Sequence, residues 1–182
     1  YNEMIFTDKK MNVRYLWLFI AASLSYFAIE SCGVSYKFTN AKLDYSIYKT
    51  IAIGDFPNRA PLVYPPLYQE FNDKLKDSYS RQTRLRIVPQ NGDYNVEGAI
   101  VGYYLQQLAV GADGLAAKTS LVMNVQVRFN NTKNPQEDFE RTFTAQKEFP
   151  ATTSFENVQG QLVSEMVDEI VDQIFNATVA SW

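Results

Sequence analysis

The residue type best suited to covalent chemistry occurs once in this chain, as Cys32. It follows a short basic segment, residues 11–14, and a largely apolar run, residues 15–29, and Gly33 comes directly after it. A basic start, an apolar run and a small residue before the cut are typical of a secretory signal. The run is too short for a typical membrane-spanning helix. In bacterial lipoproteins a thiol at this point accepts a diacylglyceryl group, so the sequence predicts cleavage before Cys32 and its lipidation.

Two other interpretations of the cysteine remain. A lone cysteine is often a small buried hydrophobe, and the segment before it could be a plain secretory signal without a lipid. Glu30 departs from the small or apolar residues that usually precede a lipidated cysteine. Lipidation would explain why an exported chain keeps one unpaired thiol.

The signal divides the chain into three parts. We expect residues 1–10 to be upstream or expression-derived sequence, residues 11–31 to be the lipoprotein signal peptide, and residues 32–182 to form a single domain.

Composition excludes several classes of chemistry. The chain has no histidine, which removes histidine-based triads and histidine metal sites. No G-x-S-x-G, P-loop or G-x-G-x-x-G motif occurs, so we expect no cofactor, no metal and no enzymatic activity. The formal net charge is −3, which gives no indication of nucleic-acid binding. Serine–lysine and carboxylate-pair enzymes are not excluded by composition. An example of the second is a carboxylate-pair hydrolase built from Asp55, Asp93 and Glu97 near strand ends.

Hydrophobic periodicity predicts strands that alternate with two helices. Asn124, Gln126 and Arg128 alternate with apolar residues in the clearest strand, and a turn-rich segment, residues 130–135, follows it. A T-x-x-E pattern, residues 153–156, predicts the capping box of the last helix. Its broad apolar stripe favours a core helix over a membrane-surface helix because the polar face is acidic. The expected strands are residues 49–56, 85–89, 94–108, 118–131 and 139–145, after a weak strand at 34–38; the expected helices run from Pro65 or Pro66 through Tyr79 and from the capping box through Phe175.

This order predicts an α/β two-layer sandwich. Two helices pack on one face of a mixed, mostly antiparallel sheet of about four strands. Glycines at 98 and 102 inside the third expected strand indicate a bend, a bulge or a close approach of another backbone segment. Residues 110–117 are expected to form a loop of small residues.

Several segments together resemble the LptE family of lipopolysaccharide-assembly lipoproteins. The signal with Cys32 and Gly33 fits, and so do residues 51–85, 91–103 and 125–143 and the final NATVASW. The resemblance implies a non-enzymatic lipoprotein on the periplasmic side of the outer membrane of a Gram-negative bacterium. It implies a plug and assembly factor that sits inside a large LptD-type β-barrel, takes part in lipopolysaccharide transport and binds lipopolysaccharide. It also implies two helices on a four-stranded sheet.

The residues are compatible with such a role. Barrel interiors are polar, so the polar strand faces around Arg128 and Glu140 could meet a barrel wall. Lipopolysaccharide carries phosphates, which lysine and arginine side chains bind. The candidate lipopolysaccharide-binding residues are Lys118, Arg128, Lys133 and Arg141. The alternative is that these are ordinary solvated surface charges.

A second functional interpretation has no barrel partner. In it the chain is a free-standing periplasmic lipoprotein that binds a ligand by itself. This interpretation predicts a deep apolar pocket, whereas the plug interpretation predicts association with a large outer-membrane barrel.

Overall fold

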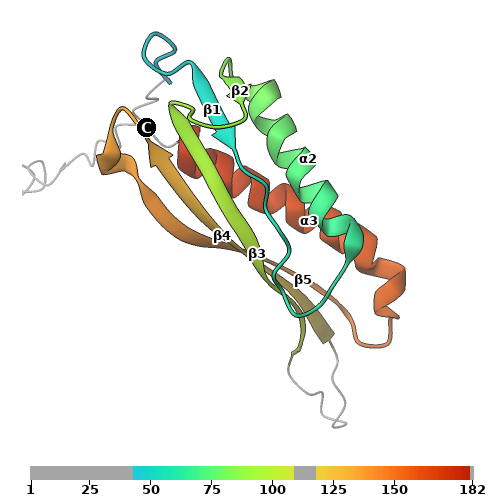
Figure 1. The fold of residues 1–182 in the computed structure, drawn as a ribbon. Helices are drawn as coiled ribbons and strands as arrows, with labels where there is room; N and C mark the ends of the chain where they lie inside the picture. Colours follow the sequence, from blue (N-terminus) through green and yellow to red (C-terminus); the bar gives the residue numbers. More distant parts are fainter. Residues whose placement is uncertain (1–42, 109–117, 181–182) are drawn as a thin grey trace, which may run out of the picture. The chain divides into compact units, whose positions relative to one another are not determined.

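The computed structural model describes residues 43–108 and 118–180, and every structural statement below concerns these residues. Cys32, the weak strand expected at 34–38 and the loop expected at 110–117 lie outside them. The elements follow the predicted order (Figure 1). They are β1 (Thr50–Ile53), α2 (Pro65–Gln82), β2 (Arg86–Val88), β3 (Tyr94–Gln107), β4 (Lys118–Asn131), η1 (Pro135–Glu137), β5 (Phe139–Pro150), α3 (Phe155–Phe175) and η2 (Asn176–Ala180).

The five strands form one mixed sheet in the order β2-β1-β3-β4-β5. β1 is parallel to both of its neighbours, β2 and β3, whereas β3, β4 and β5 run antiparallel to one another. The predicted fold class is confirmed, with one correction to the expected count of about four strands. The fifth strand is β2, which lies within the strand expected at residues 85–89. It has three residues and pairs only with β1 at the edge of the sheet.

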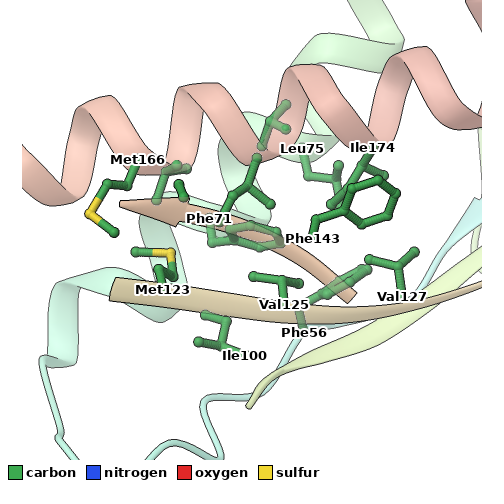
Figure 2. Packing of buried hydrophobic residues seen from close by; sticks show 14 of the residues in the cluster. Phe56, Phe71, Leu75, Ile100, Met123, Val125, Val127, Phe143, Met166 and Ile174 are labelled. Carbon is green, nitrogen blue, oxygen red and sulfur yellow. The ribbon is translucent and has the colours of Figure 1, made fainter. Parts of the chain in front are cut away.

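Both helices cover the same face of the sheet (Figure 1). The predicted helical stripe Leu67, Phe71, Leu75 and Tyr79 is fully buried. Figure 2 shows Phe71 and Leu75 of α2 and Met166 and Ile174 of α3 above side chains of β4. Burial of each such side chain contributes about 1.5–3 kcal/mol to folding. The helices also meet through Lys74, whose Nζ lies 2.6 Å from the Asp168 carboxylate.

β4 shows the predicted two-residue alternation. Its odd-numbered residues from Leu121 to Phe129 are apolar, face the helices and are fully buried, and Val122 on the other face is also buried. Gln126 and Arg128 are exposed on the other face, and Asn124 is half-buried there. A strand covered on one face alone buries one side-chain set and leaves the other in water, so the sheet has a helix-covered face and an open face.

Two local predictions need correction. The predicted capping box would place the N-cap of α3 at Thr153, but the N-cap is Ser154 and its side chain makes no capping hydrogen bond. Ser154 instead pairs its hydroxyl with the Glu156 carboxylate, which removes the reciprocal bonds of a capping box. In the strand expected at residues 85–89, Leu85 and Ile87 are two residues apart and would share one face, but Leu85 is buried whereas Ile87 is 39% exposed on the edge strand β2.

The two glycines of β3 have the expected structural roles. The register between β3 and β4 shifts between Ile100 and Gly102, which is the predicted bulge. At Gly98 an added Cβ would lie 2.1 Å from the Gln126 carbonyl oxygen and 2.5 Å from a Phe56 ring carbon. Gly98 is therefore required for the close approach of β4 and of the Phe56 ring. In the part of the chain that is described, no helix is long and apolar enough to cross a bilayer.

Candidate functional site

The open face of the sheet carries a polar surface built across its three antiparallel strands. Cross-strand neighbours on one face of a sheet lie close enough for their side chains to interact. We use the name open face for the side chains of Glu97, Asn124, Gln126, Arg128, Glu140, Thr142 and Thr144, which β3, β4 and β5 direct away from the helices.

Arg128 links the three strands on this face. Its register partners are Glu97 on β3 and Glu140 on β5. Nη2 lies 3.0 Å from Glu140 Oε2 and Nη1 lies 3.4 Å from Glu97 Oε1. The hydrogen bond to Glu140, with the charge of both carboxylates, raises the pKa of Arg128 above its ordinary value. All three side chains stay about half exposed, so the ion pairs are open to solvent and to a partner.

Further polar pairs continue along β4 and β5. Gln126 Nε2 donates to Glu140 Oε1 at 2.7 Å, and Thr144 Oγ1 donates to Asn124 Oδ1 at 2.9 Å. These hydrogen bonds hold the side chains in defined positions. Each amide, hydroxyl and carboxylate still has donor or acceptor positions free toward solvent. The open face can therefore offer an ordered array of donors and acceptors to a polar wall.

A solvent-open hollow of about 460 Å³ lies on this face beside β3. Its wall is the segment after β1, which Arg59 N–H and Pro57 C=O bind to Ile100 through hydrogen bonds of 2.8 and 3.0 Å. Its lining is mostly polar, with Arg59, Glu97 and Arg128 among the contributors. The hollow suits hydrogen-bonding groups more than an acyl chain.

Buried Asn131 forms a network of hydrogen bonds at the end of the β4–β5 hairpin. Asn131 is 2% exposed, and its Nδ2 donates to the Tyr48 hydroxyl at 3.1 Å. Its Oδ1 accepts from the backbone N–H groups of Lys133 and Asn134 at 2.9 and 3.1 Å. Its own N–H donates to Asp138 at 2.7 Å. These hydrogen bonds connect the predicted turn to β4 and to the segment before β1.

Asp93 ties the same end of the molecule to β1. Its carboxylate accepts the backbone N–H groups of Lys49 at 2.8 Å and Thr50 at 3.0 Å. It also lies 3.4 Å from Lys133 Nζ. These contacts, with the Lys49 N–H as the largest cause, lower the pKa of Asp93. The carboxylate therefore acts as a structural anion that joins β1, β3 and the hairpin.

The four predicted lipopolysaccharide-binding residues do not form one cluster. Arg128 lies on the open face, and Lys118 is ten residues earlier on β4, about 33 Å along the strand. Lys118 pairs with Glu148 at 3.0 Å. Lys133 follows the end of β4, next to Asp93. Arg141 directs its guanidinium over the Phe139 ring, 5.3 Å from the centroid, on the helix side of β5.

The three carboxylates of the enzymatic interpretation have separate partners. Asp55 pairs with Lys76 at 3.2 Å, Glu97 with Arg128, and Asp93 with β1 and Lys133. Asp55 and Glu97 line the same hollow, but Asp93 does not line it. Over the described ranges no group of three or more Cys, Asp or Glu side chains is arranged to hold a metal ion.

The sequence indicated the polar strand faces but missed their pairing. Glu97 was considered only as a catalytic carboxylate, and Glu140 only as part of a polar face. Counting residues outward from the hairpin along β4 and β5 would have found the Arg128–Glu140 pair. If Phe129 lies opposite Phe139, Arg128 lies opposite Glu140. Alternation in both strands was the available signal.

Comparisons with known proteins place the chain in a family. Residues 48–178 match the family LptE, described as Lipopolysaccharide-assembly. No curated protein matches significantly. Among solved structures, the hypothetical protein CT253 from Chlamydia trachomatis aligns with a TM-score of 0.52 and 11% identity over 71% of this chain and 97% of that one. Uncharacterized lipoprotein B from Nitrosomonas europaea aligns with a TM-score of 0.50 and 17% identity over 78% and 87%.

The structural likenesses support the fold, since their sequence identities are low. The family match extends from Tyr48, before β1, to Thr178, near the end of η2, and so covers both helices and all five strands. The chain belongs to the LptE family of lipopolysaccharide-assembly proteins.

Proposed function

We propose that this chain is a non-enzymatic lipoprotein plug and assembly factor of the outer-membrane lipopolysaccharide translocon. Its partner would be an LptD-type β-barrel, with which it would form a stable complex. The observation that carries the proposal is the family match across the whole described sheet and both helices. The open face of the sheet supports the proposal because its polar side chains suit contact with a polar barrel lumen.

A plug inside a barrel must meet a polar lumen without burying unpaired charge. On the open face, Arg128 pairs with both Glu97 and Glu140, which leaves the cluster one net negative charge, and Gln126 donates to Glu140, so each charged group has a partner. Desolvation of these groups against a polar wall therefore costs less than desolvation of lone charges. The open face is thus the surface that we assign to barrel contact.

We assign lipopolysaccharide contact to the basic residues named from the sequence. Lysine and arginine bind phosphate groups through charge-assisted hydrogen bonds. Arg141 is the strongest of the four candidates for phosphate binding, because no carboxylate of the described chain forms an ion pair with it. Lys118, Arg128 and Lys133 would have to exchange an existing carboxylate partner for a phosphate.

We place the protein on the periplasmic side of the outer membrane, held by a lipid on Cys32. A short acyl anchor suits a domain whose described helices do not span a bilayer. The lipid would keep the domain close to the barrel during assembly.

The experiment is a mild-detergent purification of the tagged chain from outer membranes, followed by mass spectrometry of what accompanies it. The proposal expects a large β-barrel in near-stoichiometric amount. Recovery of the lipoprotein alone under conditions that keep other envelope complexes intact would contradict it. That result would favour a free-standing periplasmic binding protein.

A further inference from the structure

Three exposed basic side chains lie at one end of the sheet and form no ion pair within the described residues. No carboxylate of the described residues forms an ion pair with Lys49, Arg84 or Arg86, all of which are exposed. Arg59 and Arg141 also lack an ion pair, but they lie beside the open-face hollow and on β5. The three named residues form what we call the basic edge.

The parallel pairing of β1 with β2 brings the basic edge together. The Arg86 N–H donates to the Lys49 carbonyl at 2.9 Å, and Arg86 is the register partner of Thr50. Arg84 and Arg86 flank Leu85, which is buried, so both arginines project away from the core. The Arg84 guanidinium lies 5.8 Å from the Tyr45 ring centroid.

The acidic groups near this edge have other partners. Asp44 accepts hydrogen bonds from the Ser46 N–H and hydroxyl, and Asp77 pairs with Arg81 at 2.7 Å. Asp93 accepts the backbone N–H of Lys49 and pairs with Lys133. Because the Ser46 groups are neutral, Asp44 keeps its negative charge, but the three cations of the basic edge outnumber it and the edge presents net positive charge to solvent.

The basic edge also lies where the described chain begins. Leu43 precedes Lys49 by only six residues, and the turn that follows Leu43 supplies Tyr45 to Arg84. Eleven residue steps separate Leu43 from Cys32, which is at most about 40 Å of fully extended chain. A lipid on Cys32 would thus hold this end of the sheet within reach of a membrane surface.

We propose that the basic edge is a second membrane contact, which binds the anionic headgroups of the lipid surface in which the Cys32 lipid is inserted. This inference rests on the proposed lipidation. A lipid anchor gains stability from a second signal such as a basic patch. Each lysine or arginine near an anionic surface increases binding about fivefold.

The test measures vesicle binding without the acyl chain. Residues 32–182 carrying Cys32→Ser are exported behind a cleavable secretory signal and sedimented with phosphatidylcholine vesicles that contain 0 or 30% phosphatidylglycerol, at low and at high salt. We expect binding to the anionic vesicles alone and loss of that binding at high salt. Arg84→Gln/Arg86→Gln should weaken it about 10- to 30-fold.

The matched control is Lys76→Gln/Lys147→Gln, which removes the same charge from α2 and from β5 toward the opposite end of the sheet, where both lysines pair with carboxylates. It should weaken binding less than threefold, with unchanged thermal unfolding in both variants. Equal binding to neutral and anionic vesicles, or equal losses in both variants, would overturn the proposal.

Co-purification with the barrel separates this inference from the proposed function. Arg84→Gln/Arg86→Gln should leave barrel recovery unchanged. If this variant loses the barrel while its vesicle binding is unchanged, the basic edge is a barrel contact and the membrane inference is wrong. If the wild-type chain recovers no barrel but binds anionic vesicles, the plug proposal fails and the membrane contact stands.

Discussion

Arg128 and Glu140 lie directly opposite each other on β4 and β5, and their side chains meet at 3.0 Å on the face of the sheet that no helix covers. The pair is exposed, and exposed ion pairs contribute little to folding. Substitutions here can therefore change a binding surface without unfolding the domain.

Asp93→Asn should lower the free energy of unfolding by about 1–2 kcal/mol at pH 7, because a charged acceptor of two backbone N–H groups is lost. The native state lowers the pKa of Asp93, so its contribution is present above the unfolded pKa of about 3.9. It is lost as pH falls through the lower native value. Chemical denaturation of both proteins from pH 7 to pH 2.5 should show the difference closing in acid. A gap that does not narrow between pH 7 and pH 2.5 would contradict this assignment.

Tyr79→Phe should destabilise the domain by about 1 kcal/mol at pH 7, because the buried hydroxyl lies 2.5 Å from Thr178 Oγ1. Burial raises the pKa of Tyr79, so the neutral form is favoured in the native state. Wild-type stability should fall as pH rises above about 10, with about 1.4 kcal/mol per pH unit from this residue. Denaturation from pH 8 to pH 11 should give a shallower decline for Tyr79→Phe. Tyr104→Phe, at an exposed site, controls for loss of a hydroxyl.

Gly98→Ala should destabilise the domain by about 1–3 kcal/mol, because the new methyl group would collide with the Gln126 backbone and the Phe56 ring. Gly160→Ala is the matched control. In α3 the nearest atom to its added Cβ is the Tyr64 hydroxyl oxygen at 3.5 Å, so it should stabilise the helix by up to about 1 kcal/mol. Urea denaturation measures both. Similar effects of the two substitutions would show that β3 and β4 can separate at Gly98.

Cys32→Ser, placed behind a cleavable secretory signal, should release the protein from the membrane fraction of cells that lack the barrel. The reason is that the acyl chains supply most of the affinity for the bilayer. Metabolic labelling with an alkyne fatty acid should mark the wild-type chain and leave the variant unlabelled, with equal thermal unfolding for both. A variant that stays in the membrane fraction without the barrel would contradict the anchor.

Local patterns predicted most of the fold. The alternation from Leu121 to Phe129 and the stripe from Leu67 to Tyr79 identified buried faces correctly, because a single covered face imposes its period on the sequence. The N-cap of α3 was wrong by one residue, since Thr153 and Ser154 are both good cap residues and backbone geometry decides between them.

The surface sites depended on contacts between distant segments. Arg128 meets Glu140 because the turn around η1 fixes the register of β4 against β5. Lys49 lies beside Arg86 because β1 and β2 pair in parallel across an intervening helix. Strand alternation on both sides of the hairpin carried a signal for the first pairing, whereas the second has no local signal in the sequence and required the structure.

Photo-crosslinking from Gln126 on the open face tests the central claim most directly. A crosslinkable amino acid replaces Gln126 in cells that express the barrel, and a second chain carries it at Gln82, which is exposed at the end of α2. The account predicts a strong adduct with the large β-barrel from position 126 and a weaker one from position 82. A barrel adduct from position 82 with none from position 126 would contradict the assignment of the open face to barrel contact.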